Sequence, residues 1–169
     1  DATVKTADGL SIKLFADGAD LTSMLKLYAN PKIKGFTTNP TLMRKAGIED
    51  YEAFARDVLT AIPDRPVSFE VFSDDLDEMA AQAHTIASWG DNVNVKIPVT
   101  NTKGTFTGPI IEKLSGDGIV LNVTAVFTLE QVQAIADVLD PQTPSIVSVF
   151  AGRIADTGVD PMPIMRASV

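Results

Sequence analysis

Short apolar runs alternate with stretches of helical periodicity along almost the whole chain. Six runs have the length and composition of buried strands, at residues 12–16, 35–38, 67–71, 93–97, 119–123 and 145–149. The stretches between them repeat apolar residues at helical spacing, at residues 21–28, 51–61, 76–89, 106–114 and 129–139. Strict alternation of strand and helix is typical of parallel strands joined by crossover helices. The sequence therefore predicts an α/β fold.

Polar residues stand at the carboxyl end of every predicted strand. They are Asp17, Asn39, Glu70, Lys96, Asn122 with Thr124, and Ser148. In a closed barrel these ends converge on one rim, where barrel enzymes place their chemistry, whereas an open doubly wound sheet spreads them along a crevice. The first predicted strand is not followed by Gly-x-Gly-x-x-Gly, and no phosphate-binding Gly-Lys-Ser/Thr loop occurs. A (β/α)8 TIM-type barrel is therefore the predicted fold, and nucleotide-binding folds are the weaker alternative.

Lys96 carries the strongest chemical signal because it interrupts an otherwise apolar strand. Burying an ammonium is costly unless it is paired or loses its proton, and a neutral amine is a nucleophile. A lysine on the solvated face of a strand is the ordinary alternative. The convergence of polar strand ends favours attack of this amine on a ketone, giving an iminium that permits cleavage of the adjacent carbon–carbon bond. Asp17 and Glu70 can move the protons, and Thr124 can orient a water. No role is predicted for Thr37, Thr38 or Ser68.

Composition argues against several other classes of function. The chain has 169 residues, 45% of them hydrophobic, which suits one core. It has no cysteine and one histidine, so we expect no disulfide, no metal site and no cofactor. A net charge of −8 argues against nucleic acid or an anionic membrane as partner. We find no apolar run of about 18 residues and no signal-peptide stretch, so we expect a cytoplasmic protein.

Four segments resemble the transaldolase family, which includes the fructose-6-phosphate aldolases. They are residues 35–42 (GFTTNPTL), 95–100 (VKIPVT), 121–128 (LNVTAVFT) and 148–154 (SVFAGRI). The resemblance runs from about Ile12 to Asp160. It implies a class I aldolase that transfers a dihydroxyacetone unit between sugar phosphates of the pentose phosphate pathway, with Lys96 as the Schiff-base lysine.

The resemblance also implies roles for other residues. Asp17 would be the acid/base group in carbon–carbon cleavage, and Glu70 with Thr124 would position the catalytic water. Arg153 would hold the sugar phosphate, an anion that a bidentate guanidinium suits. The hydroxyls of the dihydroxyacetone unit would be bound by Asn39, Asn122 and Ser148.

Two positions favour one branch of the family. Transaldolases carry Glu on the third strand and Phe after the sixth, whereas fructose-6-phosphate aldolases tend to have Gln and Tyr there. Glu70 and Phe150 therefore favour transaldolase. A free aldolase of the same lysine mechanism and an inactive barrel with a binding role are the alternatives. The expected partners are sugar phosphates and further copies of the chain in a homo-oligomer.

The chain is expected to supply six of the eight units of the barrel. An N-terminal extension at residues 1–11 would precede an incomplete barrel domain at residues 12–169, with strands seven and eight and the family's second phosphate-binding arginine absent. An unclosed sheet exposes the edges of its first and last strands. We therefore expect residues 1–169 alone to self-associate and to be much less active than an intact barrel.

Overall fold

The computed structural model describes residues 14–38 and 40–149, which form one parallel six-stranded sheet. The strands are β1 (Leu14–Asp17), β2 (Ile33–Thr37), β3 (Val67–Glu70), β4 (Val93–Pro98), β5 (Leu121–Val126) and β6 (Ser145–Val149). The helices are α1 (Leu21–Tyr28), α2 (Pro40–Lys45), α3 (Tyr51–Ala61), α4 (Leu76–Ala87), α5 (Gly108–Gly116) and α6 (Leu129–Val138). In the described residues the strands pair in sequence order, with β1 and β6 at the edges.

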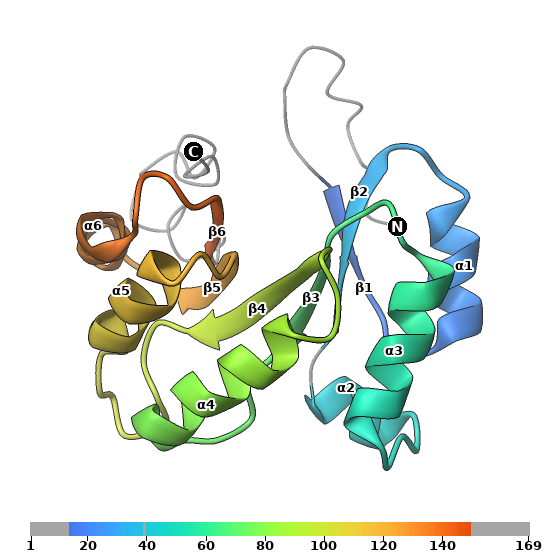
Figure 1. Cartoon of the computed structure of the whole chain (residues 1–169), viewed down its shortest axis with the longest axis horizontal. Helices are drawn as coiled ribbons and strands as arrows, with labels where there is room; N and C mark the ends of the chain where they lie inside the picture. Colours follow the sequence, from blue (N-terminus) through green and yellow to red (C-terminus); the bar gives the residue numbers. More distant parts are fainter. Residues whose placement is uncertain (1–13, 39, 150–169) are drawn as a thin grey trace.

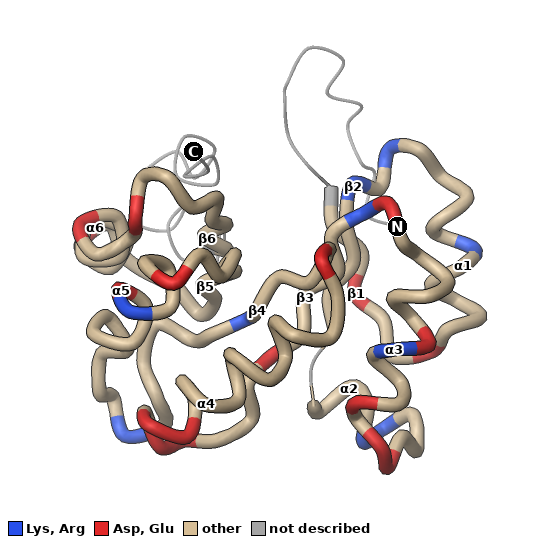
Figure 2. Tube along the Cα trace, viewed as in Figure 1, with Lys and Arg blue, Asp and Glu red and all other residues tan. Residues whose placement is uncertain are grey.

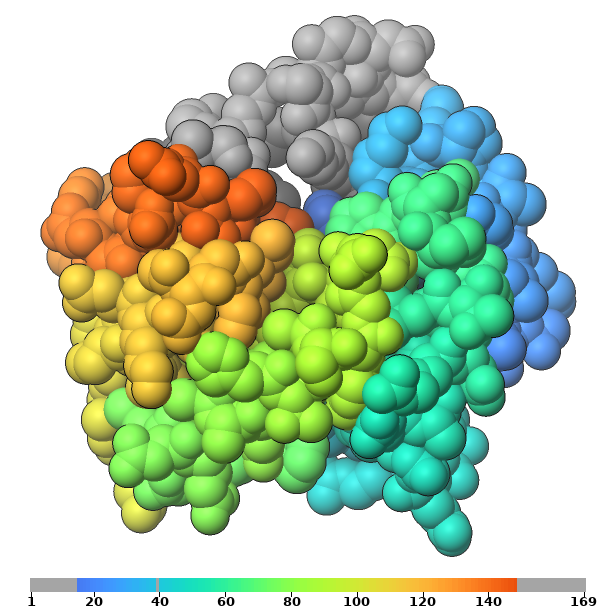
Figure 3. Space-filling model, in the orientation of Figure 1, coloured from blue at the N-terminus to red at the C-terminus, as the bar shows by residue number. Residues whose placement is uncertain are grey.

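The sheet is strongly curled and carries the helices on its outer side (Figure 1). The result is a partial (β/α) barrel of the TIM type, which confirms the predicted fold class. On the face shown in Figure 3, α5 packs between α4 and α6. In the described part of the chain, no helix combines the length and the apolar character that crossing a membrane requires.

Side-chain caps fix where several helices begin. The Asp20 carboxylate accepts the N–H groups at the start of α1, and Asp75 does the same for α4. Thr128 and Gln131 form a reciprocal capping box on α6, as that spacing indicates. Several predicted boundaries differ from those in the structure. Helix α4 ends at Ala87 rather than at residue 89, because the Ser88 N–H already closes the last turn on earlier carbonyls, and α5 spans Gly108–Gly116 rather than residues 106–114.

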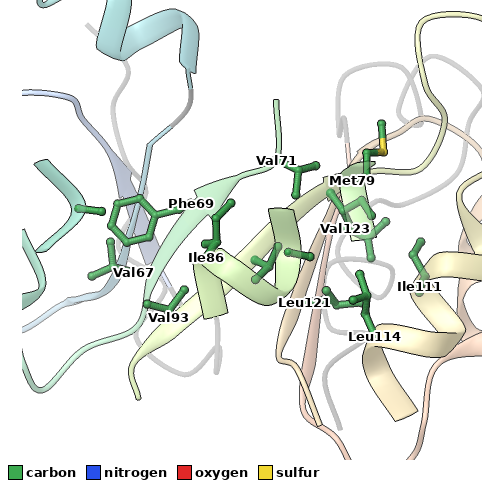
Figure 4. Packing of buried hydrophobic residues seen from close by; sticks show 14 of the residues in the cluster. Val67, Phe69, Val71, Met79, Ile86, Val93, Ile111, Leu114, Leu121 and Val123 are labelled. Atoms are coloured by element: carbon green, nitrogen blue, oxygen red, sulfur yellow. The ribbon is translucent and has the colours of Figure 1, made fainter. Parts of the chain in front are cut away.

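Alternate residues of the central strands form the core between the sheet and the helices. Phe69 on β3, Val95 and Ile97 on β4, and Val123 on β5 are fully buried. Figure 4 shows Phe69 and Val123 packed with apolar residues of α4 and α5. Because successive side chains of a strand point to opposite faces, this packing leaves the residues between them on the inner face of the curled sheet.

Charged positions are scattered over the elements. Figure 2 shows acidic residues along α3, α6 and the turns beside α2 and α4, with basic residues distributed among them. An exposed ion pair joins Arg56 to Glu52 at 2.8 Å, and His84 Nε2 lies 3.3 Å from Asp117 Oδ2 at the surface. Pairs of this exposed kind contribute about 0–1 kcal/mol each, so the fold rests mainly on its apolar core.

Candidate active site

The inner face of the sheet holds a cavity of about 340 Å³. Its lining includes five of the residues singled out from the sequence: Asp17, Lys96, Asn122, Thr124 and Ser148. They come from β1, β4, β5 and β6, which lie at intervals around the curled sheet. The lining is completed by Phe15, Thr37 and Ala125. The predicted convergence of polar strand ends is thus present for these residues.

Lys96 lies in the middle of a row of paired residues. Parallel pairing places Glu70 opposite Lys96 and Lys96 opposite Asn122, so three neighbouring strands present these side chains on the same face. Lys96 is half-buried, whereas Val95 and Ile97 beside it are buried against the helices. The alternation that buries the core therefore also turns the lysine into the interior of the barrel.

Glu70 lines a second, larger cavity of about 740 Å³, which extends from α2 to the loops that follow β3 and β4. Burial raises the pKa of the Glu70 carboxyl, and the positive charge of Lys96 partly opposes that shift. A carboxyl whose pKa is raised in this way is better matched to proton exchange near neutral pH. Its position and its pKa thus suit an acid/base role beside the amine.

Asp17 is held by a neighbour that the sequence reasoning missed. The hydroxyl of Thr37 donates a hydrogen bond to Asp17 Oδ1, and the two residues are paired across β1 and β2. Thr37 itself is buried and lines the Lys96 cavity, whereas Asp17 is exposed. The pairing register could have indicated this contact, but the threonine gave no other signal in the sequence.

Three polar side chains form a chain of hydrogen bonds across the inner face. Ser148 Oγ donates to Asn122 Oδ1 at 2.8 Å, and Asn122 Nδ2 donates to Ser68 Oγ at 3.4 Å. Asn122 and Ser68 are buried, so this network fixes which end of the Asn122 amide faces each neighbour. Ser68 is a second residue that the sequence reasoning left without a role.

A β-bulge shapes the rim next to Lys96. The pairing of β5 with β6 passes from Val123 opposite Val147 to Val126 opposite Val149, so β5 contains one extra residue. Ala125 has a φ of 58°, a left-handed conformation that is rare outside glycine. Consecutive residues Thr124 and Ala125 consequently both line the cavity.

The remaining predicted residues lie outside the described part of the chain. They are Asn39, Phe150 and Arg153. Among the residues that the structure describes, no group of three or more His, Asp or Glu side chains could hold a metal ion.

The fold and this cavity define a class of protein: a partial β/α barrel that gathers an amine, a carboxylate, an amide and three hydroxyls around one cavity, as barrel enzymes do. A family profile described as "Transaldolase/Fructose-6-phosphate aldolase" matches residues 14–167. The chain therefore belongs to the transaldolase/fructose-6-phosphate aldolase family.

Relatives support the same assignment. A "Probable transaldolase" of Dehalococcoides mccartyi is 37% identical over 155 residues, covering 92% of this chain and 68% of that protein. Proteins with the same description from Sphingopyxis alaskensis and Streptococcus agalactiae serotype V are 36% and 35% identical, covering 91% and 92% of this chain and 67% of each relative. The chain thus spans about two thirds of the length of these relatives.

Proposed function

We propose that this protein is a cytoplasmic transaldolase of the pentose phosphate pathway. It transfers a dihydroxyacetone unit from fructose 6-phosphate or sedoheptulose 7-phosphate to an aldose phosphate through a Schiff base on Lys96. The observation that carries the proposal is the position of Lys96, which lines a cavity with Asp17 and Thr124 and is paired with Glu70 across the sheet. Membership of the family and the names of the relatives support the same reaction.

The proposed reaction assigns each step to a group at the site. The neutral amine of Lys96 adds to the ketone carbon of the donor, and loss of water gives an iminium. Asp17 then takes the proton of the C4 hydroxyl as the C3–C4 bond breaks, and the bonding electrons pass into the iminium to form an enamine. The aldose phosphate leaves, and the enamine attacks the aldehyde carbon of the acceptor, which regenerates the iminium while Asp17 returns its proton to the aldehyde oxygen.

Glu70 and Thr124 serve the steps that release or consume water. Glu70 exchanges a proton with the carbinolamine oxygen when water leaves, and it assists attack of water when the product iminium is hydrolysed. Thr124 orients that water from the other side of Lys96, since β4 lies between β3 and β5. The raised pKa of the Glu70 carboxyl supports such a proton exchange.

The proposed groups that bind the donor lie partly on the sheet and partly outside the described residues. Asn122 and Ser148, already joined by a hydrogen bond of 2.8 Å, are the proposed partners of the dihydroxyacetone hydroxyls. Asn39 is proposed to bind a further hydroxyl, and the Arg153 guanidinium is proposed to hold the phosphate.

The transfer reaction is tested by comparing fructose 6-phosphate alone with fructose 6-phosphate plus erythrose 4-phosphate, using the full-length protein. We expect sedoheptulose 7-phosphate only when the acceptor is present, with little free dihydroxyacetone in either case. Rapid release of dihydroxyacetone without an acceptor would instead support the free aldolase. Absence of both products would support an inactive barrel.

Phe150 gives a second test of the branch. Because phenylalanine supplies no proton, the enamine waits for an acceptor, whereas a tyrosine hydroxyl could protonate it. We expect Phe150→Tyr to raise free dihydroxyacetone relative to transfer product. Phe127→Tyr is the control, since Phe127 follows β5 and does not line the Lys96 cavity. An unchanged ratio in folded Phe150→Tyr would contradict this account of the branch.

A further inference from the structure

Tyr51 makes a direct contact with the backbone of Glu70. Tyr51 is the first residue of α3, and its hydroxyl donates a hydrogen bond of 2.9 Å to the carbonyl oxygen of Glu70, the last residue of β3. The two residues are 19 positions apart in the sequence. A helix outside the barrel is thereby joined to the strand end that presents the Glu70 carboxyl.

The Tyr51 ring is fixed by its aromatic neighbours. Its centroid lies 6.2 Å from that of Phe69, 5.8 Å from Phe72 and 5.4 Å from Trp89. These contacts come from β3, the loop after it and the segment after α4, so they restrict the ring from several sides. Burial, and secondarily the charge of Glu70, raise the pKa of the Tyr51 hydroxyl, which therefore remains a hydrogen-bond donor throughout the neutral range.

The Glu70 peptide unit is held from both sides. The next N–H along the chain, that of Val71, donates to the carbonyl of Lys96 at 3.1 Å, which ties this end of β3 to β4. The Glu70 carbonyl is bound instead by Tyr51, from the side of α3. Together the two bonds determine where β3 ends and therefore where the Glu70 carboxyl lies relative to the amine.

We propose that Tyr51 is a positioning residue for Glu70: through the Glu70 carbonyl it holds the half-buried carboxyl beside Lys96. Tyr51 lines the same cavity as Glu70, but its hydroxyl is engaged by the Glu70 carbonyl, so the proposed role is exerted through the backbone and not on the substrate. The inference rests on the proposed function for its catalytic consequence, but its structural consequence, the environment of the Glu70 carboxyl, does not depend on the reaction.

The test compares Tyr51→Phe with Tyr28→Phe in the full-length protein. Both changes remove one hydroxyl and keep the ring, and these are the two tyrosines of the chain. The Tyr28 hydroxyl donates to Asp64 at the surface and belongs to neither cavity at the site. Tyr28→Phe thus controls for the general effect of removing a tyrosine hydroxyl.

The first measurement is independent of activity. In protein labelled with ¹³C at the glutamate carboxyls, the Glu70 signal is assigned by its loss in Glu70→Gln and then titrated. We expect Tyr51→Phe to lower the pKa of the Glu70 carboxyl toward its ordinary value, because a freer strand end admits water and reduces the desolvation that raises it. Tyr28→Phe should leave that titration unchanged. An identical Glu70 titration in Tyr51→Phe and the parent would overturn the proposal.

The second measurement concerns turnover. We normalise kcat to the concentration of active sites that borohydride can trap. The normalised kcat of Tyr51→Phe should fall about tenfold, because a misplaced Glu70 carboxyl loses much of its catalytic effect. The KM for fructose 6-phosphate should change less than twofold, and the acidic limb of the pH–rate profile should move to lower pH. The effects of two residues that act together are not additive, so Tyr51→Phe should lower kcat much less when Glu70 is already replaced by Gln. The same fold decrease in the Glu70→Gln background would overturn the proposal. If the parent traps no substrate, the proposed function fails, while the Glu70 titration still decides the role of Tyr51.

Discussion

The hydrogen bond from Thr37 to Asp17 allows the proposed role of Asp17 to be tested without changing the carboxylate. Thr37→Val removes the hydroxyl and keeps nearly the same shape in a buried position. The carboxylate of Asp17 then loses its neighbour on β2 and can rotate toward solvent, because Asp17 is exposed and lies on an edge strand of the described sheet. We therefore expect a loss of rate together with a loss of stability of no more than about 1 kcal/mol.

The size of the effect follows from the exposure of the pair. A hydrogen bond to a charged group contributes about 1.5–3 kcal/mol, and we discount this to about 1 kcal/mol because Asp17 is open to water. Since about 1.4 kcal/mol corresponds to a factor of ten, kcat/KM for fructose 6-phosphate should fall about fivefold. Removal of the carboxylate itself, as in Asp17→Asn, should cost about 10²–10⁴-fold.

Thr38 provides a matched control at the next position. It is fully buried, and its hydroxyl has no hydrogen-bond partner in the described part of the structure. Thr38→Val should leave turnover unchanged and raise the free energy of unfolding by about 1 kcal/mol, because a buried unsatisfied hydroxyl is removed. Urea unfolding and steady-state assays measure the two effects. If Thr37→Val keeps full activity, or if both variants lose activity equally, the reasoning about Asp17 is wrong.

Two further predictions concern stability. The pKa of the Glu70 carboxyl is raised above the ordinary value of 4.5, so the folded state binds this proton more tightly than the unfolded state does. The resulting stabilisation is fully present below pH 4.5 and is lost as pH rises through the folded-state pKa. Glu70→Gln should consequently have a higher urea midpoint than the parent at pH 7–8, and the difference should shrink on acidification. A difference that does not change with pH would contradict the upward direction of the pKa shift. Asn92 Nδ2 donates to the carbonyls of Ile62 at 2.8 Å and Arg65 at 2.9 Å, so Asn92→Ala should lower the free energy of unfolding by about 2 kcal/mol in the same assay. A loss below about 0.5 kcal/mol would show that water replaces both bonds.

The sequence predicted most of what depends on periodicity. Each of the six expected strands is present, because buried parallel strands are short apolar runs between helical stretches. Lys96 could be recognised because one charged residue interrupts such a run, and its inward direction follows from the burial of Val95 and Ile97. The transaldolase resemblance is confirmed at the level of the family.

Other features leave little trace in a single sequence. Helix α2 was not predicted, since its six residues are too few to show a helical period. The fifth strand continues to Val126 through a bulge at Ala125, a residue that gives no sign of a positive φ. Thr37 and Ser68 were missed because their roles depend on cross-strand partners, which pairing register determines. The roles of Asn39, Phe150 and Arg153 remain predictions.

The most direct test of the proposed function is to identify the residue that becomes attached to the substrate. The full-length protein is incubated with fructose 6-phosphate, reduced with borohydride and digested, and the modified peptide is located by mass spectrometry. We predict one modified residue, Lys96. Modification and turnover should both be abolished in Lys96→Met and retained in Lys103→Met, which changes an exposed loop lysine. Modification at another lysine, or transfer activity that survives in Lys96→Met, would contradict it.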